Sequence, residues 1–299
     1  GLWVDYKKSA DGGLQVGSPQ NQVTNIPGLY AIGECDYQYH GANRLGANSL
    51  LSCIFSGLIT APGIETLLKG QKQTAADLPS SLFESAAKQH KSRHDALLKR
   101  SGGGENPYLI HQELGDIMTK AATVVRRNDQ LEDALGKVHE LYARAKKCSL
   151  SDSGNWTNQN VVFTKALIDM FPLAFCILKG ALQRDECRGA HFKPAFAMSG
   201  LKATEPVERR KEAEAWCDKF DDNNKKWLKS SVASWTGDDV EIAYEDVDTT
   251  LIPPRPRLYG LVGSDEIEKV WKERQALKDA ASNGKGNGAA SAKAVAAAK

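Results

Sequence analysis

The sequence contains no close pair of cysteines. Its six cysteines form no C-x-x-C motif and have no zinc-finger spacing; they are Cys35, Cys53, Cys148, Cys176, Cys187 and Cys217. Isolated cysteines in a chain of this size are typical of buried thiols in a reducing compartment. We therefore expect no disulfide framework and no metal site formed by this chain.

Long apolar runs and an excess of one charge are also missing. No uninterrupted apolar run approaches the roughly 20 residues that cross a bilayer, so we expect contact with a membrane only through partner subunits. Basic and acidic residues number 39 and 37, a net charge of +2, and this balance excludes a field that favours nucleic acid. With 299 residues, 41% of them hydrophobic, the chain can bury a sizeable core in one large or two modest domains.

The opening of the chain indicates that a part precedes it. Gly1 stands where an initiator Met is expected, and residues 1–6 read as a strand with no signal peptide before it. No G-x-G-x-x-G motif follows a predicted strand, so the phosphate loop of a dinucleotide-binding domain is missing. We therefore expect the sequence to be a fragment.

Residues 1–70 have the plan of an α/β layer. Residues 1–6 and 29–33 are predicted strands. Apolar residues at helical spacing from about 47 to 68 predict a largely buried helix. A strand, a glycine-containing loop and a helix in this order are typical of a nucleotide-binding layer.

Helices dominate the rest of the chain. Glycine and proline mark a flexible joint at 101–107, and a short strand is predicted at 240–244. The predicted helices are 79–100, 108–126, 129–147, 158–184 and 205–229. Prolines make 251–257 an extended segment. The fold class we expect is α+β, in five segments: 1–70, the end of a nucleotide-binding domain; 71–106, a connecting helix and linker; 107–200, a three-helix bundle; 201–281, a small mixed region; and 282–299, a disordered tail.

Glu34 follows the predicted strand that ends at Gly33. A glycine there lets a bulky ligand approach the backbone closely, and α/β sheets place ligand contacts at the carboxyl ends of their strands. The Glu34 carboxylate can accept hydrogen bonds from sugar or ribityl hydroxyls. A solvated loop glutamate is the alternative, and the spacing leaves both open.

His40 and Arg44 lie in the next loop among small residues. Arginine presents a planar fork of donors that matches a carboxylate, and Gly41 and Ala42 leave room for a substrate beside it. A structural Arg44 paired with a loop acid such as Asp36 is the alternative. A lone histidine such as His40 is more often structural than functional, so this residue also stays open.

The predicted helix begins at Asn48-Ser49-Leu50. A helix N-terminus offers unpaired backbone N–H groups and the positive end of the helix dipole. Those donors suit an anion or the electron-rich N1–C2=O edge of a flavin. Asn48 could also be a simple N-cap, and the two roles are compatible.

Two runs in this region resemble a known family. Pro27–Glu34 reads P-G-L-Y-A-I-G-E, and His40–Leu51 reads H-G-A-N-R-L-G-A-N-S-L-L. They resemble the flavin- and substrate-binding segment of succinate dehydrogenase and fumarate reductase flavoproteins, and L-aspartate oxidase is similar here. Residues 186–191, E-C-R-G-A-H, resemble the family's E-S-R-G-A-H, with Cys187 in place of serine. The resemblance continues through residues 244–247 and 253–257, and so covers nearly the whole chain up to about residue 275.

The resemblance implies roles for these residues. It makes Arg44 the clamp for one carboxylate of a dicarboxylate substrate, and we place His40 beside it in the substrate-binding set. Ser49 and Leu50 would present backbone amides to the isoalloxazine ring of FAD, and Glu34 would bind an FAD hydroxyl. The cofactor-binding residues are thus expected to be Glu34, Asn48, Ser49 and Leu50. No residue of this chain is assigned a catalytic role.

Arg188 and His191 receive a different interpretation. We know of no catalytic duty for this motif, and we expect the two residues to pack and hydrogen-bond so that the helical domain is held against the flavin domain.

For the whole protein, the resemblance implies a flavoprotein subunit that transfers hydride between succinate and FAD. Electrons would pass to an iron–sulfur subunit, and a membrane-anchor cytochrome b subunit would hold the pair at the cytoplasmic face of the inner membrane. The fold would be the C-terminal remnant of a Rossmann-like FAD-binding domain, a three-helix bundle and a small mixed region. The family's flavin-attaching histidine and capping domain are absent here, so we expect the fragment to be inactive alone.

Two alternatives remain from the sequence. One is L-aspartate oxidase, which is independent of an iron–sulfur partner. The other is a non-catalytic helical module that docks a partner subunit.

Overall fold

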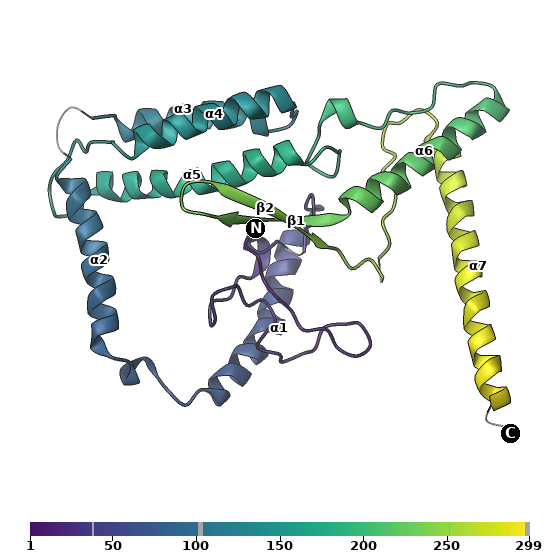
Figure 1. Cartoon of the computed structure of the whole chain (residues 1–299), viewed down its shortest axis with the longest axis horizontal. Coiled ribbons are helices and arrows are strands. Elements are labelled where there is room, and N and C mark those ends of the chain that lie inside the picture. The colour runs from purple at the N-terminus through teal and green to yellow at the C-terminus, as the bar shows by residue number, and fades with distance from the viewer. Residues whose placement is uncertain (38, 101–103, 251, 297–299) are drawn as a thin grey trace. The chain divides into compact units, whose positions relative to one another are not determined.

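The computed structural model describes residues 1–37, 39–100, 104–250 and 252–296, and it divides into two compact units (Figure 1). Unit 1 comprises Gly1–Ala195 and Ser231–Tyr244, and unit 2 comprises Phe196–Ser230 and Glu245–Lys299. The described residues are mainly helical with a two-stranded sheet, as expected for the α+β class. Residues 101–103 of the expected joint and Leu251 of the expected extended segment lie outside the described residues.

Three helices of unit 1 pack on one another: α3 (Pro107–Ala122), α4 (Asn128–Ala145) and α5 (Gln159–Gln183). Local signals start two of them. The Asn106 side chain accepts a hydrogen bond from Tyr108 N at 2.9 Å, and the Asn158 side chain accepts one from Val161 N at 3.2 Å, which satisfies orphan donors of the first turns. The core they share includes the fully buried residues Ile110, Leu131, Val138, Phe171, Phe175 and Leu178.

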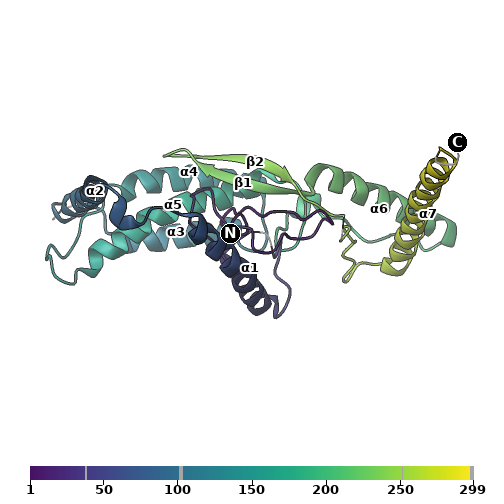
Figure 2. The ribbon, with the colours of Figure 1, turned by 90° about the horizontal axis from the view of Figure 1, so that it is seen from below.

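A β-hairpin covers part of this bundle. Strands β1 (Lys229–Trp235) and β2 (Val240–Asp246) pair with each other and run beside the bundle in both views (Figure 2). The Trp235 ring stacks on Phe175 with a centroid distance of 6.0 Å, and Val240 is fully buried in the helical core. An ion pair of 2.7 Å joins Lys179 to Asp239 at the turn. The sequence predicted part of β2 but not β1.

The strands predicted at 1–6 and 29–33 do not form. These segments make only isolated bridges, Leu2 with Asp36 and Val23 with Tyr30. A strand persists when a neighbour pairs along its whole length, and no described segment does so here. The prediction of two strands is therefore wrong: these segments have the alternating sequence pattern, but they form no ladder of backbone hydrogen bonds.

Helix α1 (Asn48–Gly70) packs on this N-terminal segment through small and polar residues. Its buried residues are Ser52, Ser56, Ile59, Thr60 and Gly63. A Cβ at Gly63 would lie 2.4 Å from Ser18 O, so only glycine allows this approach. Of the apolar residues that predicted burial, Ile59 is buried, but Leu50, Leu51, Ile54 and Leu58 are each 63–73% accessible. The expectation of a largely buried helix is therefore wrong for this chain.

Short elements connect α1 to the bundle: η2 (Ala75–Asp77) and α2 (Ser80–Leu98). Most of α2 is exposed, and its C-terminal end packs on the rest of unit 1, where Leu97 contacts Leu150 and Val161. This polar helix agrees with the one predicted at 79–100.

Two segments, Asn48–Asp77 and Gln159–Gln183, are long and apolar enough to cross a membrane by length and composition, with mean hydropathies of 1.5 and 2.0. Neither segment is an uninterrupted apolar run, because polar residues are interspersed in both. Core helices pass the same test, and α5 is one, since Phe171, Phe175 and Leu178 are fully buried in the bundle. Packing thus explains the buried face of α5, whereas Val162 and Leu173 on the same helix are exposed.

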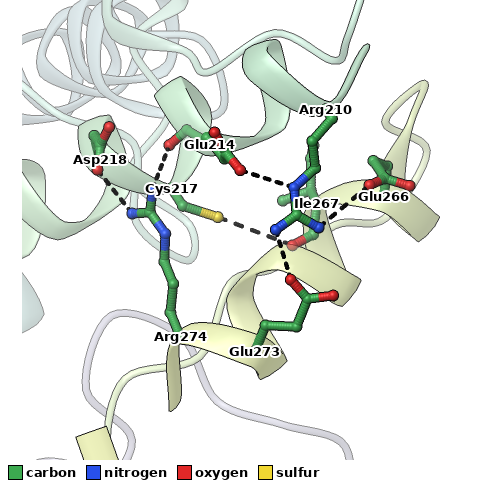
Figure 3. A network of polar contacts seen from close by, with 8 residues as sticks. All are labelled: Arg210, Glu214, Cys217, Asp218, Glu266, Ile267, Glu273 and Arg274. Atoms are coloured by element: carbon green, nitrogen blue, oxygen red, sulfur yellow. Dashed lines mark hydrogen bonds and ion pairs between the residues drawn. The ribbon is translucent and has the colours of Figure 1, made fainter. Parts of the chain in front are cut away.

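Unit 2 is built on α6 (Pro206–Trp227) and α7 (Ser264–Ala296). Ala213, Cys217, Ile267 and Val270 form its buried centre. An ion-pair network flanks this centre (Figure 3): the Arg210 guanidinium contacts Glu214 at 2.8 Å and Glu273 at 2.5 Å, and Arg274 contacts Asp218 at 2.7 Å. Charged side chains thereby join the two helices on either side of an apolar contact.

The end of α7 overlaps the segment predicted to be disordered. The described backbone is helical as far as Ala296, and disorder of residues 282–299 stays a prediction. Alanine, which is frequent there, has the highest helix propensity. Residues 297–299 of the expected tail lie outside the described residues.

All six cysteines are free, but they are not uniformly buried. Cys148 and Cys217 are buried, and burial raises the pKa of both thiols. Cys35 and Cys53 are exposed, which corrects the expectation of buried thiols for these two. Cys35 belongs to the N-terminal segment and Cys53 to α1, where the neighbouring Ile54 is also exposed.

Candidate functional site

The site predicted from the sequence centres on the turn between η1 (Gly33–Cys35) and α1. Gly33 has a φ of +70° and donates its N–H to the buried Ser56 hydroxyl at 3.0 Å. A Cβ there would lie 2.8 Å from Cys53 Sγ. We expected a ligand to approach the Gly33 backbone closely, but in this structure Cys53 and Ser56 of α1 do so. These contacts hold the backbone of Gly33, next to Glu34.

Glu34 and Arg44 lie in contact. The Arg44 Nε is 3.2 Å from Glu34 Oε1, and the two side chains are 41% and 59% exposed. The loop acid that pairs with Arg44 is therefore Glu34, whereas Asp36, the alternative considered from the sequence, is buried. An exposed pair of this kind contributes about 0–1 kcal/mol, so either side chain can exchange its partner for a ligand at little cost.

His40 lies over the first turn of α1. Its Nε2 is 3.1 Å from the Ser52 hydroxyl, and Ser52 donates its proton to Ser49 O at 2.8 Å. Because a serine has only one proton to donate, the His40 nitrogen facing it is the one that carries hydrogen. Ser52 was missed by the sequence analysis; the only signal was a small polar residue in an otherwise apolar run.

The N-terminus of α1 is open. Its N-cap is Ala47, in a left-handed conformation with φ +64°, and no side chain caps the helix. Asn48 is the first helical residue, so the structure does not give it the capping role considered from the sequence. The amides of the first turn, which include those of Ser49 and Leu50, have no intrahelical acceptor. Apolar side chains of Leu50 and Leu51 lie exposed beside these donors.

This combination fits the group that the resemblance implies. A flavin ring has an apolar face and an edge that becomes electron-rich on reduction, and α1 offers exposed leucines next to helix-terminal donors. All the predicted site residues lie within 34–50, and the structure brings Arg44 onto Glu34 and His40 onto Ser52 of α1. No group of three or more potential metal ligands occurs among the described residues.

Two family models match this chain. The family model described as fumarate reductase flavoprotein C-term matches residues 111–259, and the FAD binding domain model matches residues 1–50. The second match spans all the predicted site residues and points to FAD as the cofactor.

Curated relatives are similar over most of this chain. The succinate dehydrogenase flavoprotein subunit of Bacillus subtilis is 40% identical over 87% of the chain and 38% of the relative. The fumarate reductase flavoprotein subunit of Escherichia coli is 29% identical over 89% of the chain and 40% of the relative. The chain therefore spans about two fifths of the length of these relatives.

Solved structures have the same fold. A flavoprotein chain of E. coli quinol fumarate reductase superposes with a TM-score of 0.61 at 28% identity, covering 81% of this chain and 37% of that chain. The Sdh1 complex of Mycobacterium smegmatis with UQ1 superposes with a TM-score of 0.60 at 23% identity, covering 81% and 36%. On the motifs at residues 27–51, the two family matches and these relatives, the chain belongs to the family of succinate dehydrogenase and fumarate reductase flavoprotein subunits.

Proposed function

We propose that this chain is the part of an FAD-dependent succinate dehydrogenase or fumarate reductase flavoprotein that holds one edge of the flavin and one carboxylate of the substrate. Residues 1–70 would be the C-terminal part of a Rossmann-like FAD-binding domain, and residues 107–200 its helical domain. The observation that carries the proposal is the exposed Arg44–Glu34 pair, in which Arg44 lies four residues before the uncapped N-terminus of α1.

Each residue has a distinct task in this proposal. The Ser49 and Leu50 amides donate to the N1–C2=O edge of the isoalloxazine ring, and the Glu34 carboxylate accepts a hydrogen bond from an FAD hydroxyl. The Arg44 guanidinium leaves Glu34 and binds a substrate carboxylate with two parallel hydrogen bonds. His40, whose Nε2 N–H is held by the Ser52 hydroxyl, lies in the same loop as Arg44.

FAD supplies the hydride chemistry when it is bound. The contribution of this chain is orientation: a dicarboxylate held at one end by Arg44 has fewer ways to present its reacting carbons. Fixing such geometry accounts for much of the rate gain in reactions of this kind.

The partners follow from the same family. We propose that electrons pass to an iron–sulfur subunit and that a cytochrome b membrane anchor holds the assembly at the cytoplasmic face of the inner membrane. A solved relative at 28% identity is a quinol fumarate reductase, which supports a quinone-linked partner. Because the relatives named above are succinate dehydrogenases and fumarate reductases, L-aspartate oxidase and a purely docking module are not favoured.

Arg44→Lys in the holoenzyme that contains this chain tests the proposal. Lysine keeps the charge but loses the planar fork, so kcat/KM for succinate should fall about 10- to 1000-fold while flavin content stays near normal. Glu34→Ala should lower flavin occupancy first. Arg93→Lys, on the exposed face of α2, is the matched control and should change neither quantity.

The measurements are flavin absorbance and succinate-dependent dye reduction. If Arg44→Lys loses flavin but its flavin-loaded fraction has normal kinetics, Arg44 is structural and the substrate role is wrong.

A further inference from the structure

The loop that follows α5 contacts the loop that carries Arg44, although about 145 residues of sequence separate them. The N–H of Ala190 donates to Ala42 O at 3.2 Å. Gly189, with φ +58°, approaches so closely that a Cβ would lie 2.7 Å from the carbonyl carbon and oxygen of Ala42. The backbone is thus held two residues before Arg44.

The contacting residues form the tip of a tight turn. Arg188 N donates to His191 O at 2.9 Å, and His191 N donates to Arg188 O at 3.0 Å, so Gly189 and Ala190 have little freedom. Beneath the turn, the fully buried Glu186 carboxylate accepts from Arg184 at 2.6 Å and from Arg188 at 3.0 Å. A buried carboxylate with two guanidinium partners holds its neighbours in a defined geometry.

The turn is also anchored to the helical bundle. Arg126 lies between α3 and α4, and its guanidinium is 2.8 Å from His191 Nδ1. The backbone N–H of Arg126 also donates to Phe192 O at 2.9 Å. The buried Lys193 donates to Leu182 O at 2.9 Å and to Asp185 at 3.0 Å. A continuous set of polar contacts therefore runs from the bundle to Ala42.

We propose that residues 184–193, here called the brace loop, position Arg44 for substrate. The inference rests on the proposed function of Arg44 but assigns no substrate contact to the brace loop itself. Arg188 and His191 make the turn rigid. Gly189, at the tip of the brace loop, packs against the backbone of Ala42 in the loop at 40–46. Substrate orientation would then depend on a domain that does not touch the substrate.

Gly189→Ala in the holoenzyme tests this role. The added Cβ meets backbone atoms of Ala42, so that loop must shift; a shift of about 1 Å can cost on the order of 100-fold in rate. We expect kcat/KM for succinate to fall about 10- to 100-fold, mainly through a raised KM, with flavin content retained. Gly17→Ala is the control, because Gly17 has a similar φ of +75° but no atom within 4 Å of the added Cβ.

Hydrogen exchange of the peptide covering residues 40–47 provides a readout that does not depend on activity. Exchange there should speed up in Gly189→Ala and stay unchanged in Gly17→Ala. Should Gly189→Ala fail to fold, Gly189→Asn is the second variant: it places the same Cβ against Ala42 but tolerates a positive φ better than alanine.

The outcomes separate the two proposals. Faster exchange together with a raised KM supports the brace loop. Unchanged exchange, or faster exchange with normal succinate kinetics, overturns it. If Arg44→Lys impairs turnover of succinate while Gly189→Ala does not, the brace is wrong and the function of Arg44 stands; if neither variant affects kinetics, the proposed function of Arg44 is itself wrong.

Discussion

His191 is a buried histidine whose two ring nitrogens have different partners. Nδ1 lies 2.8 Å from the Arg126 guanidinium and so accepts a hydrogen bond, while Nε2 donates to Arg184 O at 2.7 Å. This arrangement requires the neutral ring. Burial lowers the pKa of His191 below its ordinary value of 6.5; the hydrogen bond to Arg184 O opposes this shift, and the positive charges of Arg126, Lys193 and Arg184 add to it.

The lowered pKa of His191 makes stability depend on pH. Below pH 6.5 the unfolded chain binds a proton that the folded chain does not, so the free energy of unfolding falls as pH decreases toward the folded pKa. Between pH 7.5 and 5.5 we expect this histidine to remove up to about 1.4 kcal/mol. His191→Gln, which can keep both hydrogen bonds without titrating, should flatten the dependence.

Urea unfolding of the full chain at the two pH values measures this effect. His90→Gln replaces an exposed histidine of α2 and should leave the dependence as in the unmodified chain. An equal loss of stability on acidification in the unmodified chain and in His191→Gln would rule out His191 as the source.

Among the elements, α5 is the one on which unit 1 depends most. It contacts α2, α3 and α4. Its residue Phe175 is fully buried, and the Phe175 ring contacts the rings of Tyr142, His139 and Trp235. Aromatic rings in such clusters contribute through both area and edge or stacked contacts. The same helix leaves Leu173 62% exposed, so one element contains both a core position and a surface position two residues apart.

Phe175→Ala should therefore lower the free energy of unfolding by about 3–5 kcal/mol, because it removes a buried ring and leaves a cavity. Leu173→Ala, the matched control on the same helix, should change it by less than about 0.5 kcal/mol. Denaturant unfolding followed by tryptophan fluorescence measures both, since Trp235 stacks on Phe175. Similar losses for the two variants would mean that α5 faces its neighbours differently from this description.

For the whole chain, the prominent feature is the apolar face of α1. Leu50, Leu51, Ile54 and Leu58 are exposed along one helix, and contiguous apolar surface of this kind is typical of an interface. The chain spans about two fifths of the length of its curated relatives. We expect the full chain on its own to bind a hydrophobic dye and to self-associate through this face.

Ile54→Lys with Leu58→Lys should reduce both dye binding and self-association. Leu109→Lys, at a position in α3 that is similarly exposed at 62%, is the control and should have a much smaller effect. Dye fluorescence and sedimentation of the 299-residue chain provide the measurements. An unmodified chain that is monomeric and does not bind the dye would contradict the expectation.

From the sequence alone the family was identified, the six helices α1 to α6 were predicted, and candidate site residues were named; α7 was not predicted. Helical hydrogen bonds join residues four apart, so the periodicity of α3, α4 and α5 is local and readable. The string from His40 to Leu51 is likewise continuous in the chain, which is why the candidate ligand-binding residues could be named before the fold was known.

Which of these residues contact one another depends on the tertiary structure. It paired Arg44 with Glu34 rather than Asp36, placed Cys53 against Gly33, and brought Gly189 onto Ala42. It also left the strands predicted at 1–6 and 29–33 without a ladder and exposed the face of α1 that apolar spacing had assigned to the core. Strand pairing and burial depend on partners distant in the sequence, and neither alternation nor hydrophobic periodicity specifies whether such a partner is present.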